Sequence, residues 1–297
     1  MQFYGSPVTS HHCTVNLRLR MAVLMFWNIG KRDNAHAIGQ LCQLHDVDIL
    51  LLAEAEIPSA RLTVTLNDFH VGTGAMWELP RRGSRIRAFT RYAPGYIEGV
   101  FDDGRVKFLH LRPPIGQPLL ITATHLSSKL WANDDDQRYQ VRRLRFDIVT
   151  QEAKAEHQNT LIIGDLNINP FEEALTAADG LHGVMDKQDA MRPARVVLGQ
   201  KWDYFYNPMW SRLGDESSGP PGTYRRSGSG LVNHFWHTFD QVLLRPPLLR
   251  FYSPEGLIVP QKVGDQPILS PVGRGSGLSD HLPIVLSLSI EKDLSDG

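Results

Sequence analysis

Short apolar runs with the length of buried strands recur along this chain, and several of them end in a polar residue. Residues 161–163 are followed by Gly164, Asp165 and Asn167. Because glycine lets the backbone turn sharply, a carboxylate and a carboxamide are expected to leave the carboxyl end of that strand. By the same criteria, strands are predicted at 22–27, 48–53, 85–91, 96–101, 105–111, 118–125, 160–164, 239–244, 248–252 and 282–290.

Two segments have the spacing of amphipathic helices. Residues 34–45 place apolar side chains on one side, and Asp33 is positioned to cap them. Residues 134–158 carry a longer apolar stripe surrounded by arginines, whereas 207–234 are rich in Gly, Ser and Pro and are predicted to be a loop. Strands and helices that mix without strict alternation favour an α/β fold of two facing sheets with helices outside.

The length of 297 residues suits one large domain, and no internal repeat or long linker divides it. We predict a single domain over 21–290 and a frayed tail over 291–297. Residues 1–20 are expected to be either an N-terminal arm or a segment upstream of a start at Met21. No apolar run approaches the ~20 residues of a membrane span, and the polar start of the chain is not typical of a secretory signal. The sequence therefore predicts neither membrane insertion nor an obligate protein partner.

Charge and cysteine content indicate which kinds of protein this chain can be. The net charge of −1 argues against coating nucleic acid by bulk electrostatics, although it allows a local basic groove. Cys13 and Cys42 are too few for a disulfide framework. Reduced thiols and a cytoplasmic location are the expectation.

The polar residues at the strand ends are the candidate functional residues. Each has an ordinary structural interpretation when taken alone, such as a turn cap, an ion pair or a hydrogen-bonded core histidine. Together they form an oxygen-rich set without a cysteine cluster or a His-x-x-x-His motif, which suits Mg²⁺ or Mn²⁺ better than zinc. The set is Asn28, Glu54, His125, Asp165, Asn167, Asp240, Asp280 and His281.

In this order the motifs resemble the endonuclease/exonuclease/phosphatase superfamily, which includes deoxyribonuclease I. The resemblance rests on Trp27-Asn28, residues 48–54, Thr124-His125-Leu126, Gly164-Asp165-Leu166-Asn167, Phe239-Asp240-Gln241-Val242-Leu243 and Ser279-Asp280-His281. It extends from about residue 21 to 290. The resemblance implies a deoxyribonuclease I-like, four-layer α/β/β/α sandwich with the site at one edge.

The resemblance also implies roles for the acidic and amide residues. Glu54 corresponds to the principal metal-binding glutamate, with Asn28 and Asp280 close to the metal. Asp165 would bind or orient a second metal or the attacking water, and Asn167 would hold a phosphate oxygen.

The two histidines receive different roles from the same resemblance. His281 corresponds to the residue that takes a proton from water, and Asp240 would fix its tautomer and raise its basicity. His125 would protonate or stabilise the phosphoryl oxygens. The segment 123–127 has the histidine form of this motif and departs from the abasic-endonuclease pattern.

Substrate contacts are predicted from basic and aromatic segments. Arg85 and Arg87 alternate in a predicted strand, so they are expected to share a face that follows a phosphate backbone, or else to protect a sheet edge. Tyr224 and Arg225 lie in an aromatic-rich segment and fit base stacking and phosphate contact.

These features lead to one main hypothesis and two alternatives. The main hypothesis is a Mg²⁺-dependent phosphodiesterase, with DNA as the expected nucleic-acid substrate. The first alternative is a phosphatase or phosphodiesterase that acts on a small-molecule or lipid head-group ester. The second is a nucleic-acid-binding module without turnover.

Overall fold

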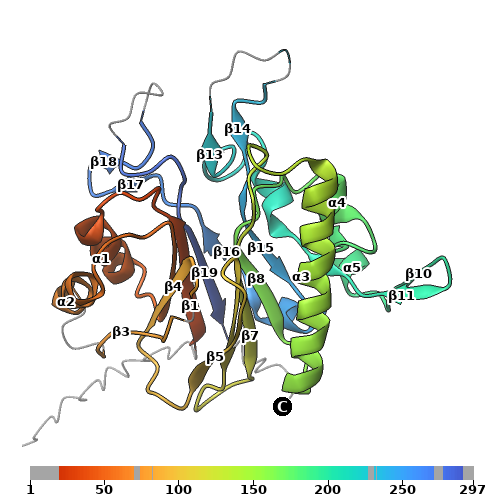
Figure 1. Ribbon diagram of the computed structural model, residues 1–297, viewed down its shortest axis with the longest axis horizontal. Helices are drawn as coiled ribbons and strands as arrows, with labels where there is room; N and C mark the ends of the chain where they lie inside the picture. Colours follow the sequence, from red (N-terminus) through yellow and green to blue (C-terminus); the bar gives the residue numbers. More distant parts are fainter. Residues whose placement is uncertain are drawn as a thin grey trace, which may run out of the picture.

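A computed structural model describes residues 20–69, 74–81, 83–226, 231, 233–270 and 277–289. Apart from Arg20, the predicted arm of residues 1–20 and the tail of residues 291–297 lie outside this part of the chain. Two mixed β-sheets form its centre (Figure 1).

The first sheet contains the N-terminal and C-terminal strands of the described chain. Its six strands in the described residues are arranged β16-β19-β1-β2-β4-β3. Central β1 runs parallel to β2 and antiparallel to β19, so the start of β19 lies beside the end of β1. The bounds are β1 Arg20–Asn28, β2 Ile49–Ala53, β3 Trp77–Glu78, β4 Ile86–Thr90, β16 Tyr252–Ile258 and β19 Ile284–Ser289.

The second sheet is built from the middle of the chain. Its seven described strands are arranged β5-β6-β7-β8-β15-β12-β9. Here β7 and β8 are parallel, and β15 runs antiparallel to β8. The bounds are β5 Ile97–Asp102, β6 Val106–Leu111, β7 Leu119–His125, β8 Thr160–Asp165, β9 Gly183–Val184, β12 Phe205–Tyr206 and β15 Asp240–Leu244.

Helices cover the outer face of each sheet, which gives four layers (Figure 1). On the first sheet lie α1 (Ala35–Leu44) and α2 (Ser59–Phe69), and on the second lies α3 (Asp134–Ala155), with α4 (Glu173–Thr176) and α5 (Lys187–Ala190) nearby. The larger apolar core includes residues of both sheets, whereas the smaller one lies between the second sheet and α3. The predicted sandwich of two sheets between helices is confirmed.

Several short strands and 3₁₀ helices lie outside the two central parts of the sheets. The ribbon of β13 (Tyr224–Arg225) and β14 (Trp236–His237) lies mostly within the segment that was predicted to be a loop, and it borders the site described below. The others are β10 Arg195–Val197, β11 Gln200–Trp202, β17 Lys262–Val263, β18 Gln266–Pro267 and the 3₁₀ helices η1 Pro208–Arg212 and η2 Pro246–Phe251. No helix in the described residues is long and apolar enough to cross a bilayer.

Three sequence-based expectations about elements were wrong in detail. The strand predicted at 248–252 is mostly the 3₁₀ helix η2, because Pro246 and Pro247 fix φ and lack the N–H that a sheet ladder needs. Asn34 rather than Asp33 stands at the start of α1, and Asp33 pairs with Arg61 instead. Helix α2 was not predicted, because only Leu62 and Leu66 of its residues are buried and its apolar stripe is narrow.

A buried and a partly buried histidine meet at the outer side of the second sheet. Nε2 of His110 on β6 lies 3.2 Å from Nε2 of His157, which follows α3. Burial lowers the pKa of both imidazoles, and the nearby Arg112 lowers both further. At least one ring must stay neutral for this hydrogen bond to form.

This pair should make the fold sensitive to mild acid. A lowered histidine pKa means that the folded state binds fewer protons, so the stabilisation is present above the ordinary value near 6.5 and is lost as the pH falls below it. We expect the free energy of unfolding in urea to fall between pH 7 and pH 5. His157→Gln, which does not titrate in this range, should lose less stability over the same interval. An equal loss in both proteins would contradict this role for the pair.

Candidate active site

The predicted site residues converge where strand ends of both sheets meet. On the second sheet, Asp165 at the end of β8 lies opposite Asp240 on one side and His125 on the other. On the first sheet, β1 ends at Asn28 and β2 is followed by Glu54. The indole Nε1 of Trp27 donates to His281 O at 2.9 Å, which fixes the segment before β19 beside β1.

Unusual backbone conformations aim the side chains at this point. Glu54 and Asn167 both have left-handed φ angles, 50° and 53°, directly after buried strands. Such angles are uncommon for residues other than glycine and concentrate at functional sites. At Gly164 a Cβ atom would lie 2.2 Å from Thr124 O, so only glycine allows β7 and β8 to approach this closely before Asp165.

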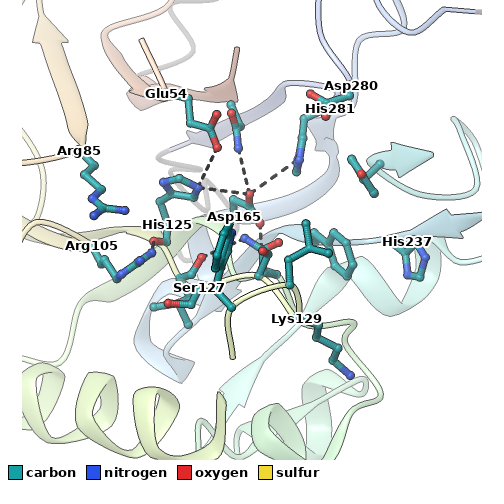
Figure 2. A pocket seen from close by; sticks show the side chains of 18 of the residues that line it. Glu54, Arg85, Arg105, His125, Ser127, Lys129, Asp165, His237, Asp280 and His281 are labelled. Atoms are coloured by element: carbon teal, nitrogen blue, oxygen red, sulfur yellow. Dashed lines mark hydrogen bonds and ion pairs between the residues drawn. The ribbon is translucent and has the colours of Figure 1, made fainter. Parts of the chain in front are cut away.

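Asp165 lies at the centre of the group of polar side chains in the site (Figure 2). Its Oδ2 accepts a hydrogen bond from Asn28 Nδ2 at 3.1 Å, and its Oδ1 accepts one from Asn167 N at 2.9 Å. His125 Nε2 lies 3.9 Å from Asp165 Oδ2 and 3.4 Å from Glu54 Oε1. The hydrogen bond with His125 lowers the pKa of Glu54 despite its partial burial. Both sheets therefore contribute a carboxylate to one small volume.

A histidine–aspartate pair lies on the other side of Asp165. His281 Nδ1 and Asp240 Oδ2 are 2.8 Å apart, and Asp240 is fully buried. Burial alone would lower the pKa of His281, but the carboxylates of Asp240 and Asp165 outweigh it and raise that pKa. Thr223 Oγ1 accepts from Asp240 N at 3.0 Å and fixes the start of β15. With Nδ1 held by Asp240, Nε2 of His281 is the atom left to exchange a proton.

The donor set fits a hard divalent cation. Glu54, Asp165 and the Asn28 amide meet in hydrogen-bonding contact, and His125 Nε2 lies between the two carboxylates where positive charge is favoured. A Cβ at Gly30 would lie 3.0 Å from Asp280 Oδ1, so the Asp280 carboxylate covers the turn after β1. Oxygen donors of this kind suit Mg²⁺ or Mn²⁺.

A second grouping of possible ligands has a different explanation. One ligand atom from each of Asp165, Asp240 and His281 lies within 4.8 Å of the others. However, the short contact between His281 Nδ1 and Asp240 Oδ2 has the length of a hydrogen bond, which occupies both atoms. The geometry therefore describes these two residues as a hydrogen-bonded pair beside the Asp165 carboxylate rather than as two metal ligands.

An open pocket of about 450 Å³ exposes this cluster to solvent. Most of the residues predicted from sequence line it, while Asp240 lies buried behind His281. Tyr224 joins the wall by packing its ring 4.6 Å from the ring of His281. The predicted residues in the lining are Asn28, Glu54, Arg85, His125, Asp165, Asn167, Tyr224, Asp280 and His281.

Two arginines predicted to contact substrate are not in the pocket. Arg87 is 1% exposed and forms an ion pair with Glu78 at 2.9 Å, which helps to lower the pKa of Glu78 to about 2 against the effect of burial. The expected common face of Arg85 and Arg87 is therefore wrong, because Arg85 precedes β4 whereas Arg87 is buried within it. Arg225 lies outside as well, with its guanidinium 5.5 Å from the ring of Trp236.

The rim of the pocket contains residues that sequence reasoning missed. Arg226, directly after β13, lines the pocket together with Tyr224, whereas Arg225 between them does not, because successive residues of a strand face opposite ways. Trp131 is 86% exposed in the loop after His125, where Lys129 also lines the pocket. Arg105 stands just before β6. For Lys129 and Trp131, the only feature of the sequence that could have indicated a position at the pocket is the polar loop directly after the histidine motif.

The family model for the Endonuclease/Exonuclease/phosphatase family matches residues 25–281, which include all eight strand-end residues described above. This chain belongs to the endonuclease/exonuclease/phosphatase family. Members of the family are phosphoric ester hydrolases that depend on a divalent metal. The family predicted from the order of the motifs is thus confirmed.

Solved structures show the same fold at low sequence identity. A family protein from Bacteroides thetaiotaomicron is 10% identical with a TM-score of 0.54, over 92% of this chain and 98% of that chain. Truncated Caenorhabditis elegans TDP2 is 15% identical with a TM-score of 0.51, over 90% of this chain and 97% of that chain. A comparison with curated proteins gave no match.

Proposed function

We propose that this protein is a divalent-metal-dependent phosphodiesterase that hydrolyses DNA, with Mg²⁺ as its cation and Mn²⁺ as a substitute. The observation that carries the proposal is the 2.8 Å contact between His281 Nδ1 and Asp240 Oδ2, directly beside the Asp165 carboxylate in an open pocket. Phosphodiester hydrolysis needs a proton acceptor for water and positive charge near the phosphoryl oxygens. The catalytic domain would comprise residues 21–290, in the cytoplasm as the cysteine content favours.

Each side chain has a distinct part in this proposal. His281 accepts a proton from the attacking water at Nε2, while Asp240 holds its other nitrogen and stabilises the imidazolium that forms. Asn167 has two amide hydrogens, of which one donates to Leu126 O at 3.0 Å and the other is available for a phosphoryl oxygen. A cation held by Glu54, Asn28, Asp165 and Asp280 would neutralise charge on the phosphoryl group.

His125 would act on the opposite side of the phosphate from His281. Its Nε2 faces Glu54 and Asp165, the carboxylates that would hold a cation, so the imidazole lies within reach of a phosphoryl group bound there. A protonated His125 can donate to a phosphoryl oxygen or to the leaving oxygen, which lowers the energy of the departing alkoxide.

The rim of the pocket supports a nucleic acid over a small ester. Arg85, Arg105 and Arg226 place positive charge around the acidic cluster although the whole chain is near neutral, whereas Lys129 at the same rim is paired with Asp134 and Glu172. Such a local basic wall suits a phosphate backbone. Trp131 is almost fully exposed at the same rim, where an aromatic face can stack on a base.

Cleavage assays test the proposal. Labelled single-stranded DNA, double-stranded DNA, RNA and bis-p-nitrophenyl phosphate would each be incubated with Mg²⁺, with Mn²⁺ or with EDTA. We expect DNA cleavage with either cation, none in EDTA, and a loss of at least about a hundredfold in Asp165→Asn.

Other outcomes would redirect the assignment. Hydrolysis of the small ester without any cleavage of DNA or RNA would overturn the nuclease proposal in favour of a small-molecule or lipid head-group phosphodiesterase. Full activity of wild-type protein in EDTA would overturn the metal dependence. An inactive wild-type protein under all conditions would overturn the enzyme assignment and favour a binding module.

A further inference from the structure

Two arginines from different sheets meet at one side of the pocket. Arg85 precedes β4 of the first sheet, and Arg105 precedes β6 of the second. The two main-chain segments are hydrogen-bonded to each other, since Arg85 N donates to O of Gly104, the residue before Arg105, at 3.0 Å. Figure 2 shows both side chains on the His125 side of the pocket, with His281 and His237 farther across.

These two guanidinium groups form no ion pair with the carboxylates of the described residues. With the described residues, Arg85 forms no side-chain hydrogen bond or ion pair. Arg105 reaches only His125 O, at a long 3.4 Å. By contrast, Arg87 is paired with Glu78 and Arg112 with Glu98. Two neighbouring cations without a carboxylate between them form a place where an anion is favoured.

The electrostatics of Arg105 agree with this geometry. Its partly buried position lowers the pKa of the guanidinium, and the positive charge of Arg85 lowers it further, while the neighbouring Asp103 only partly opposes this shift. The charge of Arg85 thus disfavours the charged form of Arg105. An anion between them would remove this repulsion, and a guanidinium pair can present several parallel N–H donors to phosphate oxygens.

The position of the pair relative to the catalytic groups indicates which anion it takes. His125 N donates to Arg105 O at 2.8 Å, so Arg105 is the direct main-chain neighbour of the histidine expected on the leaving-group side. A phosphate between the arginines would thus lie next to the scissile phosphate, beyond His125. This relation rests on the proposed function, because it assumes that the carboxylate cluster holds the scissile phosphate.

We propose that Arg85 and Arg105 form a second phosphate-binding subsite, beside His125, for the phosphate adjacent to the scissile one on the same strand. The substrate class is thereby narrowed to esters that carry at least two phosphates in sequence. A polynucleotide meets this condition, and so does a small bisphosphorylated compound. A head group with a single phosphodiester does not.

Binding provides a test that needs no turnover. The dissociation constants of thymidine 3′,5′-bisphosphate and of thymidine 3′- and 5′-monophosphate would be measured by calorimetry with Mg²⁺ present. We expect wild-type protein to bind the bisphosphate about ten- to a hundredfold more tightly than either monophosphate, as one or two charge-assisted hydrogen bonds would give. Arg85→Gln and Arg105→Gln should each reduce this ratio about tenfold or more.

A matched variant controls for the loss of one positive charge. Arg112→Gln removes an exposed arginine at the other end of β6 and should keep the wild-type ratio. Melting temperatures would be measured for all variants, because Arg105 also contacts His125 O. If Arg105→Gln proves unstable, Arg85→Gln alone tests the subsite, since the Arg85 side chain forms no hydrogen bond or ion pair with the described residues.

Kinetics distinguish a nucleic acid from a small bisphosphate. Hydrolysis of the dinucleotide TpT would be compared with that of pTpT and TpTp, each at low substrate concentration. A higher kcat/KM for one of the two terminally phosphorylated forms, with that advantage lost in Arg85→Gln, supports a polynucleotide in the subsite. An intact bisphosphate preference without any dinucleotide hydrolysis would keep the subsite and overturn the nuclease proposal. Equal binding of mono- and bisphosphates by wild-type protein would overturn the subsite itself.

Discussion

His281→Ala should lower kcat for phosphodiester hydrolysis by about 10²- to 10⁴-fold, the usual contribution of a positioned general base. His281 is the imidazole that is both anchored by Asp240 at 2.8 Å and exposed to the pocket that contains Asp165. Its removal leaves the attacking water without a proton acceptor while the carboxylates remain in place. Single-turnover rates on DNA at saturating enzyme would report the chemical step without interference from product release.

The controls separate a lost base from a damaged fold. His36→Ala removes an exposed histidine on α1 and should retain wild-type activity. Added imidazole should partly restore the His281→Ala rate, because a small base can enter the pocket that the side chain leaves. Asp240→Asn should lower kcat while retaining the imidazole, since the amide no longer stabilises the imidazolium. A His281→Ala protein with more than half of the wild-type rate would contradict the base assignment.

Glu54→Gln should weaken Mg²⁺ or Mn²⁺ binding by at least about a hundredfold. Replacement of an outer hydrogen-bond partner of a metal ligand typically costs 10–100-fold, and a direct carboxylate ligand is expected to cost more. The substitution keeps the size of the side chain and removes its charge. Calorimetric titration with each cation measures the effect without any need for turnover.

Glu56→Gln is the matched control for this loop. Glu56 is two residues away, exposed, and paired with Lys31 at 3.4 Å, so its replacement removes the same charge outside the pocket. We expect its cation affinity to stay within about twofold of wild type, because exposed charges interact weakly through water. Equal weakening in both variants would show that overall charge, rather than coordination by Glu54, governs cation binding.

The centre of the fold was predictable because its signals are local. Buried strands such as β8 are short apolar runs, and the glycine before Asp165 marks the close approach to β7. Polar residues directly after such strands have few places to point except the shared sheet edge. The order of these strand-end motifs was therefore enough to predict the family and to place the candidate site at this edge of the sheets.

The predictions failed where the direction of a side chain depends on contacts with residues far away in the sequence. Alternation placed Arg85 and Arg87 on one face, but Glu78 on β3 draws Arg87 into a buried ion pair that no local pattern encodes. At the β13–β14 ribbon a one-residue change of facing replaced Arg225 with Arg226. Trp131 and Arg105 lie in loops or before strands, where no periodicity indicates direction. The substrate side of the pocket is therefore the part that sequence alone did not resolve.

The site lies across a seam between two halves of the protein. Asn28 and Glu54 belong to one sheet, whereas His125, Asp165 and Asp240 belong to the other. The larger apolar core and a few polar contacts, such as the hydrogen bond from Asn28 to Asp165, hold the two sets together. A cation bound by residues of both halves would bind only the folded protein. It would therefore raise the free energy of unfolding in proportion to the logarithm of its concentration, once that concentration exceeds the dissociation constant. If the proposed function is right, removal of the cation should therefore lower the stability of the fold as well as the activity.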